Sequence, residues 1–338
     1  MPKRIAAFGE VMMRLQVPGY ELLSQSNTLQ YSFSGTGVNV SAALTRFGHT
    51  GYLVSTLPDH SVGDAAIAYL RKLGITASFI RRDGKYVGMY FLENGFGARA
   101  SRVTYTNRLE SSFNTAAADA YDFAAIAQEI DVVHFCGITL AMNDPVRSQM
   151  KTFAQAVKSA GGTVVFDCNY RPSLWGEGAY EKARPYYEDM LGLADIVMMN
   201  EKDALLTLGM STDKQSRREQ LVDLIPAVAV KYNIRAIAGT HRSINGDNTH
   251  ALQGFLYKDA RFAFAEPLSF AVHDRIGAGD AYTSGIIHGE TAGWAPEETV
   301  AFAAAAGMLA HTIVGDTPMS SESDIRKAMA ATVSDVER

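Results

Sequence analysis

Short apolar runs alternate along this sequence with longer stretches of helical periodicity. The runs occupy residues 4–8, 51–56, 131–137, 163–169, 195–200 and 235–240, and helices are predicted over 38–47, 62–73, 145–160, 180–193 and 216–231. The runs are apolar throughout instead of alternating, which is typical of strands buried on both faces. This succession predicts an α/β fold with a central, mostly parallel sheet between two layers of helices. Ligands gather at the carboxyl ends of the strands in such a fold.

Two stretches depart from this pattern. Residues 11–34 and 78–108 alternate polar and apolar side chains between Gly and Asn turns, which predicts antiparallel strands standing apart from the main sheet. We expect them to form a small β-strand lid, and an edge hairpin without motion is the alternative. Since no linker divides the chain, residues 1–338 are predicted to form a single domain that carries this lid.

Charge and hydropathy exclude several classes of partner. The chain has 31 Lys and Arg against 36 Asp and Glu, a net charge of −5, and no basic stripe, so neither nucleic acid nor an anionic membrane surface is expected to bind. No apolar run reaches the roughly 18 residues of a membrane span. The two cysteines, Cys136 and Cys168, lie inside predicted buried strands and indicate core packing. We therefore expect a cytoplasmic protein that acts on a small molecule.

The stretch DRIGAGDAY (274–282) is the first candidate for chemistry. Gly277 and Gly279 precede a small-residue run that can start a helix, and the free N–H groups at a helix N-terminus attract phosphate. Asp280 would repel a phosphate as a ligand, but it can accept the proton of a hydroxyl that attacks a phosphoryl group. Taken alone, the stretch is more typical of a plain glycine turn before a helix.

Three further polar stretches are candidates for binding. In SGTGVNV (34–40), Gly35 allows close approach of a ligand and Asn39 can hydrogen-bond hydroxyls, with helix capping as the alternative. In FDCNYRPSLW (166–175), Asp167, Asn169 and Arg171 would project to one side of an extended chain, and Arg171 is the cation best placed to meet an anion.

The third stretch, NEKD (200–203), follows another predicted strand. Asn200 and Asp203 offer oxygen ligands that suit Mg²⁺ directly or through water, and an ordinary helix cap is the alternative. Other phosphate motifs are absent from the sequence. No G-x-x-x-x-G-K-[ST] occurs, and Tyr282 and Val40 stand where G-x-G-x-x-G requires its third glycine.

In their order along the chain, these motifs resemble the PfkB, or ribokinase-like, family of carbohydrate kinases. The resemblance runs from Phe8-Gly9-Glu10 to the final helices. It implies a ribokinase-like three-layer sandwich with a small β-strand lid over the sugar site, and a homodimer or higher homo-oligomer formed through the lid. It also implies ATP and Mg²⁺ as cofactors.

The family's roles can be carried over to matching positions. Asp280 would be the general base, and the anion hole for the γ-phosphoryl group would be formed by Gly277, Ala278 and Gly279. The nucleotide would contact Asn200, Thr240, Gly277 and Gly279, with Mg²⁺ near Asn200 and Asp203, held through water. The sugar would be bound by Glu10, Gly35, Asn39, Tyr90, Tyr105, Arg108 and Arg171.

The resemblance also narrows the substrate. The pattern F-D-x-N-x-R-x-x-L-W is similar to 2-keto-3-deoxygluconate kinases and to fructokinases, while residues 88–93 and 102–108 resemble lid strands of the former. A sugar acid needs a cation, because a carboxylate buried without a partner is costly. Arg171 is the first candidate, Arg108 the second and Arg102 the third.

We therefore expect an ATP-dependent kinase for the terminal hydroxyl of 2-keto-3-deoxygluconate. A fructokinase or other neutral-sugar kinase is the alternative within the family. A non-catalytic sugar-sensing binding protein is the alternative of another class. A dinucleotide-dependent oxidoreductase fits only the α/β alternation, because the glycine fingerprint is missing.

Four positions depart from the family pattern. Arg275 and Ile276 replace a small or threonine pair before GAGD, and Arg275 could contact a phosphate or the substrate, or pair with Asp274. Asp203 stands where the family usually has Glu. Asn107 occupies the usual place of the lid arginine, one residue before Arg108. The nucleotide loop GTHRS (239–243) keeps one glycine, so the preferred phosphoryl donor stays open.

Overall fold

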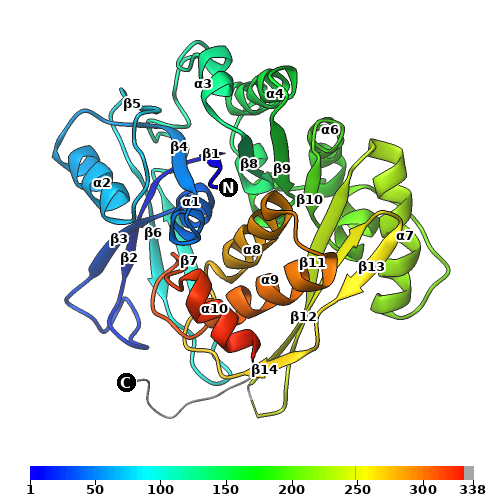
Figure 1. The fold of residues 1–338 in the computed structure, drawn as a ribbon. Helices are drawn as coiled ribbons and strands as arrows, with labels where there is room; N and C mark the ends of the chain where they lie inside the picture. The colour runs from blue at the N-terminus through cyan, green and yellow to red at the C-terminus, as the bar shows by residue number, and fades with distance from the viewer. Residues whose placement is uncertain (248, 331–338) are drawn as a thin grey trace.

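The computed structural model describes residues 1–247 and 249–330 of the predicted single domain; residues 248 and 331–338 lie outside this description. Its largest element is a ten-stranded sheet (Figure 1). The strands are β1 (Arg4–Phe8), β4 (Thr50–Leu57), β5 (Ile80–Arg82), β8 (Val132–Cys136), β9 (Thr163–Asp167), β10 (Ile196–Met198), β11 (Ala236–Ile244), β12 (His250–Lys258), β13 (Arg261–Phe264) and β14 (Leu268–Phe270).

The strand order is β13-β12-β11-β10-β9-β8-β1-β4-β5, with β14 beside β12. From β11 to β5 every neighbouring pair is parallel, which confirms the predicted mostly parallel sheet. The antiparallel strands β12, β13 and β14 extend it at one edge and were not among the predicted runs. Partly exposed residues interrupt the apolar sequence of these three strands, so they lack the continuous apolar run that marks a strand buried on both faces.

Helices cover both faces of this sheet (Figure 1). One layer contains α1 (Thr36–Arg46), α8 (Ala278–Ala292), α9 (Pro296–Ala310) and α10 (Glu322–Met329). The other contains α3 (Phe123–Glu129), α4 (Asp144–Ser159), α6 (Ala179–Leu191) and α7 (Arg217–Tyr232). Successive residues of a strand enter opposite cores: Phe166 packs toward the α4 side and Val165 toward the α8 side. Both cores therefore require apolar side chains, as the predicted strands have.

A second sheet stands apart from the first (Figure 1). It consists of β2 (Met12–Gln16), β3 (Gln30–Ser34), β6 (Gly88–Glu93) and β7 (Arg102–Thr106), in the order β3-β2-β6-β7. Two details of the predicted lid were wrong. Strands β2 and β6 are parallel, and residues 80–82 of the predicted lid form β5, which pairs with β4 in the main sheet. A three-residue strand carries too little alternation to reveal which sheet it joins.

The helix that begins at the GAGD stretch is fixed by close packing. A Cβ atom at Gly285 of α8 would lie 2.6 Å from the Cα atom of Ala303 in α9, so the two helices contact through their backbones. The remaining helices are α2 (Ser61–Lys72), which packs beside β3, and the short α5 (Pro172–Trp175). In the part of the chain that the structure describes, no helix combines the length and hydropathy needed to cross a membrane.

Candidate active site

The N-terminus of α8 is the centre of the site. Gly277 precedes the helix with φ 84°, the left-handed region that favours glycine, and a Cβ atom there would overlap the carbonyl oxygen of Asp316. The N–H of Ala281 donates to the carbonyl of Gly277 at 2.9 Å. Amides earlier in the first turn lack such intrahelical acceptors. The predicted glycine turn thus presents free N–H donors at a helix N-terminus, where an anion is favoured.

Asp280 lies in this first turn and is buried. Its Oδ2 accepts a hydrogen bond of 2.7 Å from the side-chain amide of Asn39 in α1. The hydroxyl of Thr317 donates to the Asn39 Oδ1 at 3.3 Å, which orients the amide. Burial raises the pKa of Asp280 to about 7, although the Asn39 hydrogen bond and the charge of Arg171 act in the opposite direction. A carboxyl with this pKa can both accept and release a proton near neutrality.

Two cavities meet beside Asp280. The strand-end cavity, of about 580 Å³, lies along the carboxyl ends of β9 and β10 and beside the middle of β11. The small-sheet cavity, of about 480 Å³, lies under the second sheet and is lined by Asp280 itself. Both cavities are lined by Asn169, Arg171, Arg275 and Gly279. A group bound in one cavity can therefore reach a group bound in the other at the start of α8.

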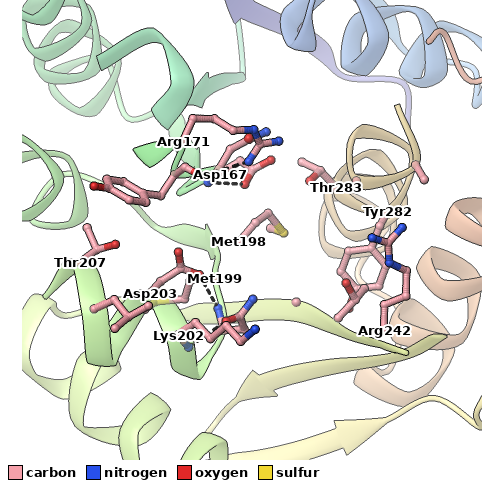
Figure 2. A pocket seen from close by; sticks show the side chains of 18 of the residues that line it. Asp167, Arg171, Met198, Met199, Lys202, Asp203, Thr207, Arg242, Tyr282 and Thr283 are labelled. Atoms are coloured by element: carbon pink, nitrogen blue, oxygen red, sulfur yellow. Dashed lines mark hydrogen bonds between the residues drawn. The ribbon is translucent and has the colours of Figure 1, made fainter. Parts of the chain in front are cut away.

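Carboxyls and basic side chains line the strand-end cavity (Figure 2). Burial, with repulsion from Asp280, raises the pKa of Asp167 to about 7, and burial raises that of Asp203 to about 6. Figure 2 shows Arg171 and Arg242 on opposite sides of the cavity. No carboxylate of the described residues forms an ion pair with either arginine. The cavity therefore combines carboxyls and arginines that are not joined in ion pairs.

Asn200 and Asp203 are held by reciprocal capping contacts. The backbone N–H of Asn200 donates to Asp203 Oδ2 at 2.9 Å, and Asn200 Oδ1 accepts from the N–H of Lys202 at 2.9 Å. Asn200 therefore caps this turn, as the alternative describes, and its predicted place beside Mg²⁺ stays a prediction, as does that of Asp203. Asn169 has φ 33°, and its side-chain oxygen is buried without a hydrogen-bond partner in the described structure. A buried acceptor of this kind is expected to meet a ligand or water.

The small-sheet cavity contains a buried acid–base pair. Arg108 Nε donates to Glu10 Oε2 at 2.9 Å, and Asn114 donates to Glu10 Oε1 at 3.3 Å. Burial raises the pKa of Glu10, while Arg108 opposes the shift. The Arg108 guanidinium also lies 4.8 Å from the ring centre of Tyr105, and its Nη1 is buried without an acceptor. Gly35 approaches the Glu10 carbonyl so closely that a Cβ atom would overlap it.

Most predicted binding residues line one of the two cavities. The small-sheet cavity contains Glu10, Gly35, Asn39, Tyr90, Tyr105, Arg108 and Arg171, and the strand-end cavity contains Asn200, Asp203, Thr240, Ala278 and Gly279. Gly277 lines the small-sheet cavity only. Arg102 lines neither, and its side chain is 73% exposed beside Glu93.

A buried charge network was not predicted. Arg14 of β2 is almost completely buried; its Nη2 donates to Asp274 Oδ2 at 3.0 Å, and its guanidinium also pairs with Asp316. The hydroxyl of Tyr90 donates to the Asp316 carboxylate. Asp274 is thus neutralised by Arg14, and the predicted alternative of an Asp274–Arg275 pair is wrong. An arginine in a strand of alternating polarity normally faces solvent, so the sequence around Arg14 gives no sign that it is buried. Its acidic partners lie 260 or more positions away in the sequence, and no local pattern connects them to it.

The chain matches known carbohydrate kinases over most of its length. A family model described as pfkB family carbohydrate kinase matches residues 2–323. The 2-dehydro-3-deoxygalactonokinase of Haloferax volcanii is 26% identical over 331 residues and covers 97% of each chain. Among solved structures, a candidate 2-keto-3-deoxygluconate kinase from Enterococcus faecalis is 38% identical, with a TM-score of 0.95 and 99% of both chains covered.

A second solved structure gives the same result. The 2-dehydro-3-deoxygluconokinase of Thermotoga maritima is 30% identical, with a TM-score of 0.92 over 98% of this chain and 99% of its own. These matches agree with the ten-stranded sheet, the small second sheet and the glycine turn at α8. The chain belongs to the pfkB family of carbohydrate kinases.

Proposed function

We propose that this carbohydrate kinase transfers the γ-phosphoryl group of ATP to the terminal hydroxyl of 2-keto-3-deoxygluconate. The observation that carries the proposal is the position of Asp280. Its buried carboxyl lies on the small-sheet cavity, beside the N-terminus of α8, where that cavity meets the strand-end cavity. A sugar hydroxyl and a phosphoryl donor bound in separate cavities would meet there.

The strand-end cavity fits a magnesium nucleotide. Asp167 is buried and Asp203 partly buried; both carboxyls have raised pKa values and no ion-pair partner among residues 1–247 and 249–330. Bound Mg²⁺ would supply the positive charge that offsets theirs and that of the phosphates. No cluster of three His, Cys, Asp or Glu forms a metal cage in the described residues. Mg²⁺ would therefore be held largely by phosphate oxygens and water near Asp203 and Asn200.

The residues at the start of α8 provide the chemistry. Asp280 accepts the proton of the sugar hydroxyl while the hydroxyl oxygen forms its bond to the γ-phosphorus and the bond to the departing ADP oxygen breaks. The N–H groups of residues 277–279 hold the phosphoryl oxygens as charge builds up. Asn39 keeps the Asp280 carboxyl fixed through the 2.7 Å hydrogen bond. Thr240, on the strand-end cavity, would contact the nucleotide.

The charge of Arg171 favours a sugar acid over a neutral sugar. Its guanidinium lines the small-sheet cavity and has no carboxylate partner among the described residues. Arg108 lines the same cavity, but Glu10 neutralises it at 2.9 Å. A substrate carboxylate would therefore gain more from Arg171, in a charge-assisted and potentially bidentate contact. Glu10, Gly35 and Tyr105 would bind the remainder of the sugar.

The test is Arg171→Ala, measured by coupled ADP release with 2-keto-3-deoxygluconate and with fructose. Losing a charge-assisted contact of about 1.5–3 kcal/mol should lower kcat/KM for the sugar acid by roughly 10- to 100-fold. The value for fructose should change by less than about threefold, within the range of weak contacts. Arg102→Ala is the matched control, because this arginine lines neither cavity.

The same assay separates the alternatives. Equal losses with both substrates would favour a neutral-sugar kinase. A selective loss in Arg108→Ala, with Arg171→Ala unaffected, would assign the carboxylate to the second candidate. Binding of the sugar without ADP release in the wild type would favour the sensing protein.

We also propose that the protein forms a homodimer or higher homo-oligomer through the small sheet. Strand β7 is an edge strand, and its residues Arg102–Tyr105 are all exposed. An exposed edge presents unpaired backbone groups that a second copy can cover. Light scattering should give at least twice the monomer mass of 36.6 kDa. A monomer at micromolar concentration would contradict this assembly.

A further inference from the structure

The side chain of Arg275 lies at the junction of the two cavities without an ion-pair partner in its own loop. Its side chain is exposed and lines both cavities. No carboxylate of the described residues lies within ion-pair distance of it; the neighbouring Asp274 is paired with Arg14 instead. A cation at the junction of two cavities, free of a protein partner, is available to a ligand.

The backbone on both sides of Arg275 is fixed. Asp274 accepts hydrogen bonds from the N–H groups of Arg275, at 2.7 Å, and Ile276, at 3.2 Å, while Arg14 anchors its carboxylate. The side chain of Ile276 packs against the small-sheet residues Met12, Tyr90 and Leu92. The backbone from which the Arg275 side chain extends toward the cavities is therefore fixed before any ligand binds.

The surroundings of Arg275 favour an anion of high charge density. Burial, with repulsion from Arg275, lowers the pKa of Arg242, another arginine of the strand-end cavity. Two cations that repel each other face the same cavity, and Gly279 at the start of α8 lines it too. A phosphate chain would relieve this repulsion, whereas a neutral nucleobase or sugar ring would not.

We propose that Arg275 is a catalytic residue that contacts the phosphoryl group during its transfer. Arg242 contacts the part of the donor that stays behind. The γ-phosphorus must cross from the strand-end cavity to the small-sheet cavity, and Arg275 lines both while Arg242 lines only the first. Negative charge spreads over the phosphoryl oxygens as the bond to the ADP oxygen breaks and the bond to the sugar oxygen forms. This inference rests on the proposed phosphoryl transfer and deepens it.

The test compares Arg275→Ala with Arg275→Lys and with Arg242→Ala, the arginine assigned to the other part of the donor. The wild type is first assayed for ADP release with the sugar acid and with neutral sugars. The best sugar is then used for the binding and melting measurements, while kcat of every variant is measured with each sugar that the wild type accepts. Three quantities are then measured: kcat, the dissociation constant of MgADP by titration calorimetry, and the rise in melting temperature when aluminium fluoride joins MgADP and sugar. Aluminium fluoride mimics the phosphoryl group in transit, so the last quantity does not depend on turnover.

We expect Arg275→Ala to lower kcat by at least about 100-fold, as removal of a donor to developing charge does. Its MgADP dissociation constant should stay within about threefold of the wild type, and the aluminium fluoride stabilisation should disappear. For Arg275→Lys, kcat and the aluminium fluoride stabilisation should lie between those of the wild type and of Arg275→Ala, because lysine keeps the charge but lacks the planar guanidinium. Arg242→Ala should weaken MgADP by a larger factor than it lowers kcat.

Three results would overturn the inference. Arg275→Ala could keep kcat within threefold of the wild type. It could weaken MgADP as much as it lowers kcat, which would indicate ground-state binding. It could lose activity with the sugar acid alone, which would make Arg275 a substrate-carboxylate residue. A wild type that releases no ADP with any sugar overturns the proposed function and this inference with it, and is recognised before any variant is compared.

Discussion

Replacing Asp280 by asparagine should remove most turnover and, at alkaline pH, make the folded protein more stable. Burial raises the pKa of this carboxyl from 3.8 to about 7. Between these two values the folded state holds a proton that the unfolded state has released. The contribution of Asp280 to stability therefore falls as pH rises from about 4 to about 7. Above pH 7 the buried charge costs roughly 4 kcal/mol, since each pKa unit is worth about 1.4 kcal/mol.

Asparagine keeps the shape of the side chain and an oxygen for the Asn39 amide, and it carries no charge. Asp280→Asn should therefore gain stability relative to the wild type, and the gain should be about 2 to 3 kcal/mol larger at pH 8.5 than at pH 5. Turnover should fall by about 10²- to 10⁴-fold through loss of the base. Dissociation constants for nucleotide and sugar should change little.

Urea unfolding at the two pH values, together with coupled ADP release, measures both effects. Asp119→Asn is the control for removing an aspartate charge, because Asp119 is exposed. A pH-independent difference between Asp280→Asn and the wild type would refute the account of the buried carboxyl. Wild-type turnover in Asp280→Asn would refute its assignment as the base.

Three other predictions follow from the same geometry. The wild-type kcat/KM should rise with pH through about 7 as Asp280 loses its proton, and a flat profile from pH 5 to 8 would contradict this. Gly277→Ala should lower the free energy of unfolding in urea by about 2 kcal/mol or more and disrupt turnover. Gly279→Ala should leave that free energy unchanged, because its Cβ atom would meet nothing within 4 Å. Arg14→Met should cost about 3–5 kcal/mol by leaving two carboxylates unpaired. Adding Asp316→Asn should restore part of that loss, and no recovery would argue against the ion pair.

The main sheet could be predicted from the sequence because its strands are buried on both faces. Phe8 and Phe166 enter one core while Ile5 and Val165 enter the other, so the runs are apolar without interruption. The strands β12, β13 and β14 could not be predicted in the same way, because their partly exposed residues interrupt the apolar pattern. The orientation of β2 beside β6 depends on a long connection that no local pattern records.

The parts of the site that lie in one local motif could also be predicted from the sequence, and those assembled from distant residues could not. The turn at Gly277 and the carboxyl of Asp280 lie in one local motif, so the sequence alone predicts the glycine turn and the start of the helix. The chemistry expected of them depended on the family resemblance. The network around Arg14 joins residues from three distant parts of the chain, including Asp274 and Asp316. Arg14 lies in a strand whose side chains alternate between polar and apolar, where a charged side chain usually faces water. Its position between the Asp274 and Asp316 carboxylates becomes visible only in the folded structure. The pKa of Asp167 likewise depends on burial and on Asp280, which lies in a different element.

The most direct test of the central claim is the ratio of kcat/KM for 2-keto-3-deoxygluconate to that for fructose, measured with MgATP and the wild-type protein. If Arg171 binds the substrate carboxylate beside Asp280, this ratio should be at least about 10, because a charge-assisted contact of about 1.5 kcal/mol or more is lost with a substrate that lacks the carboxylate. A ratio near one, or a preference for fructose, would contradict the sugar-acid assignment.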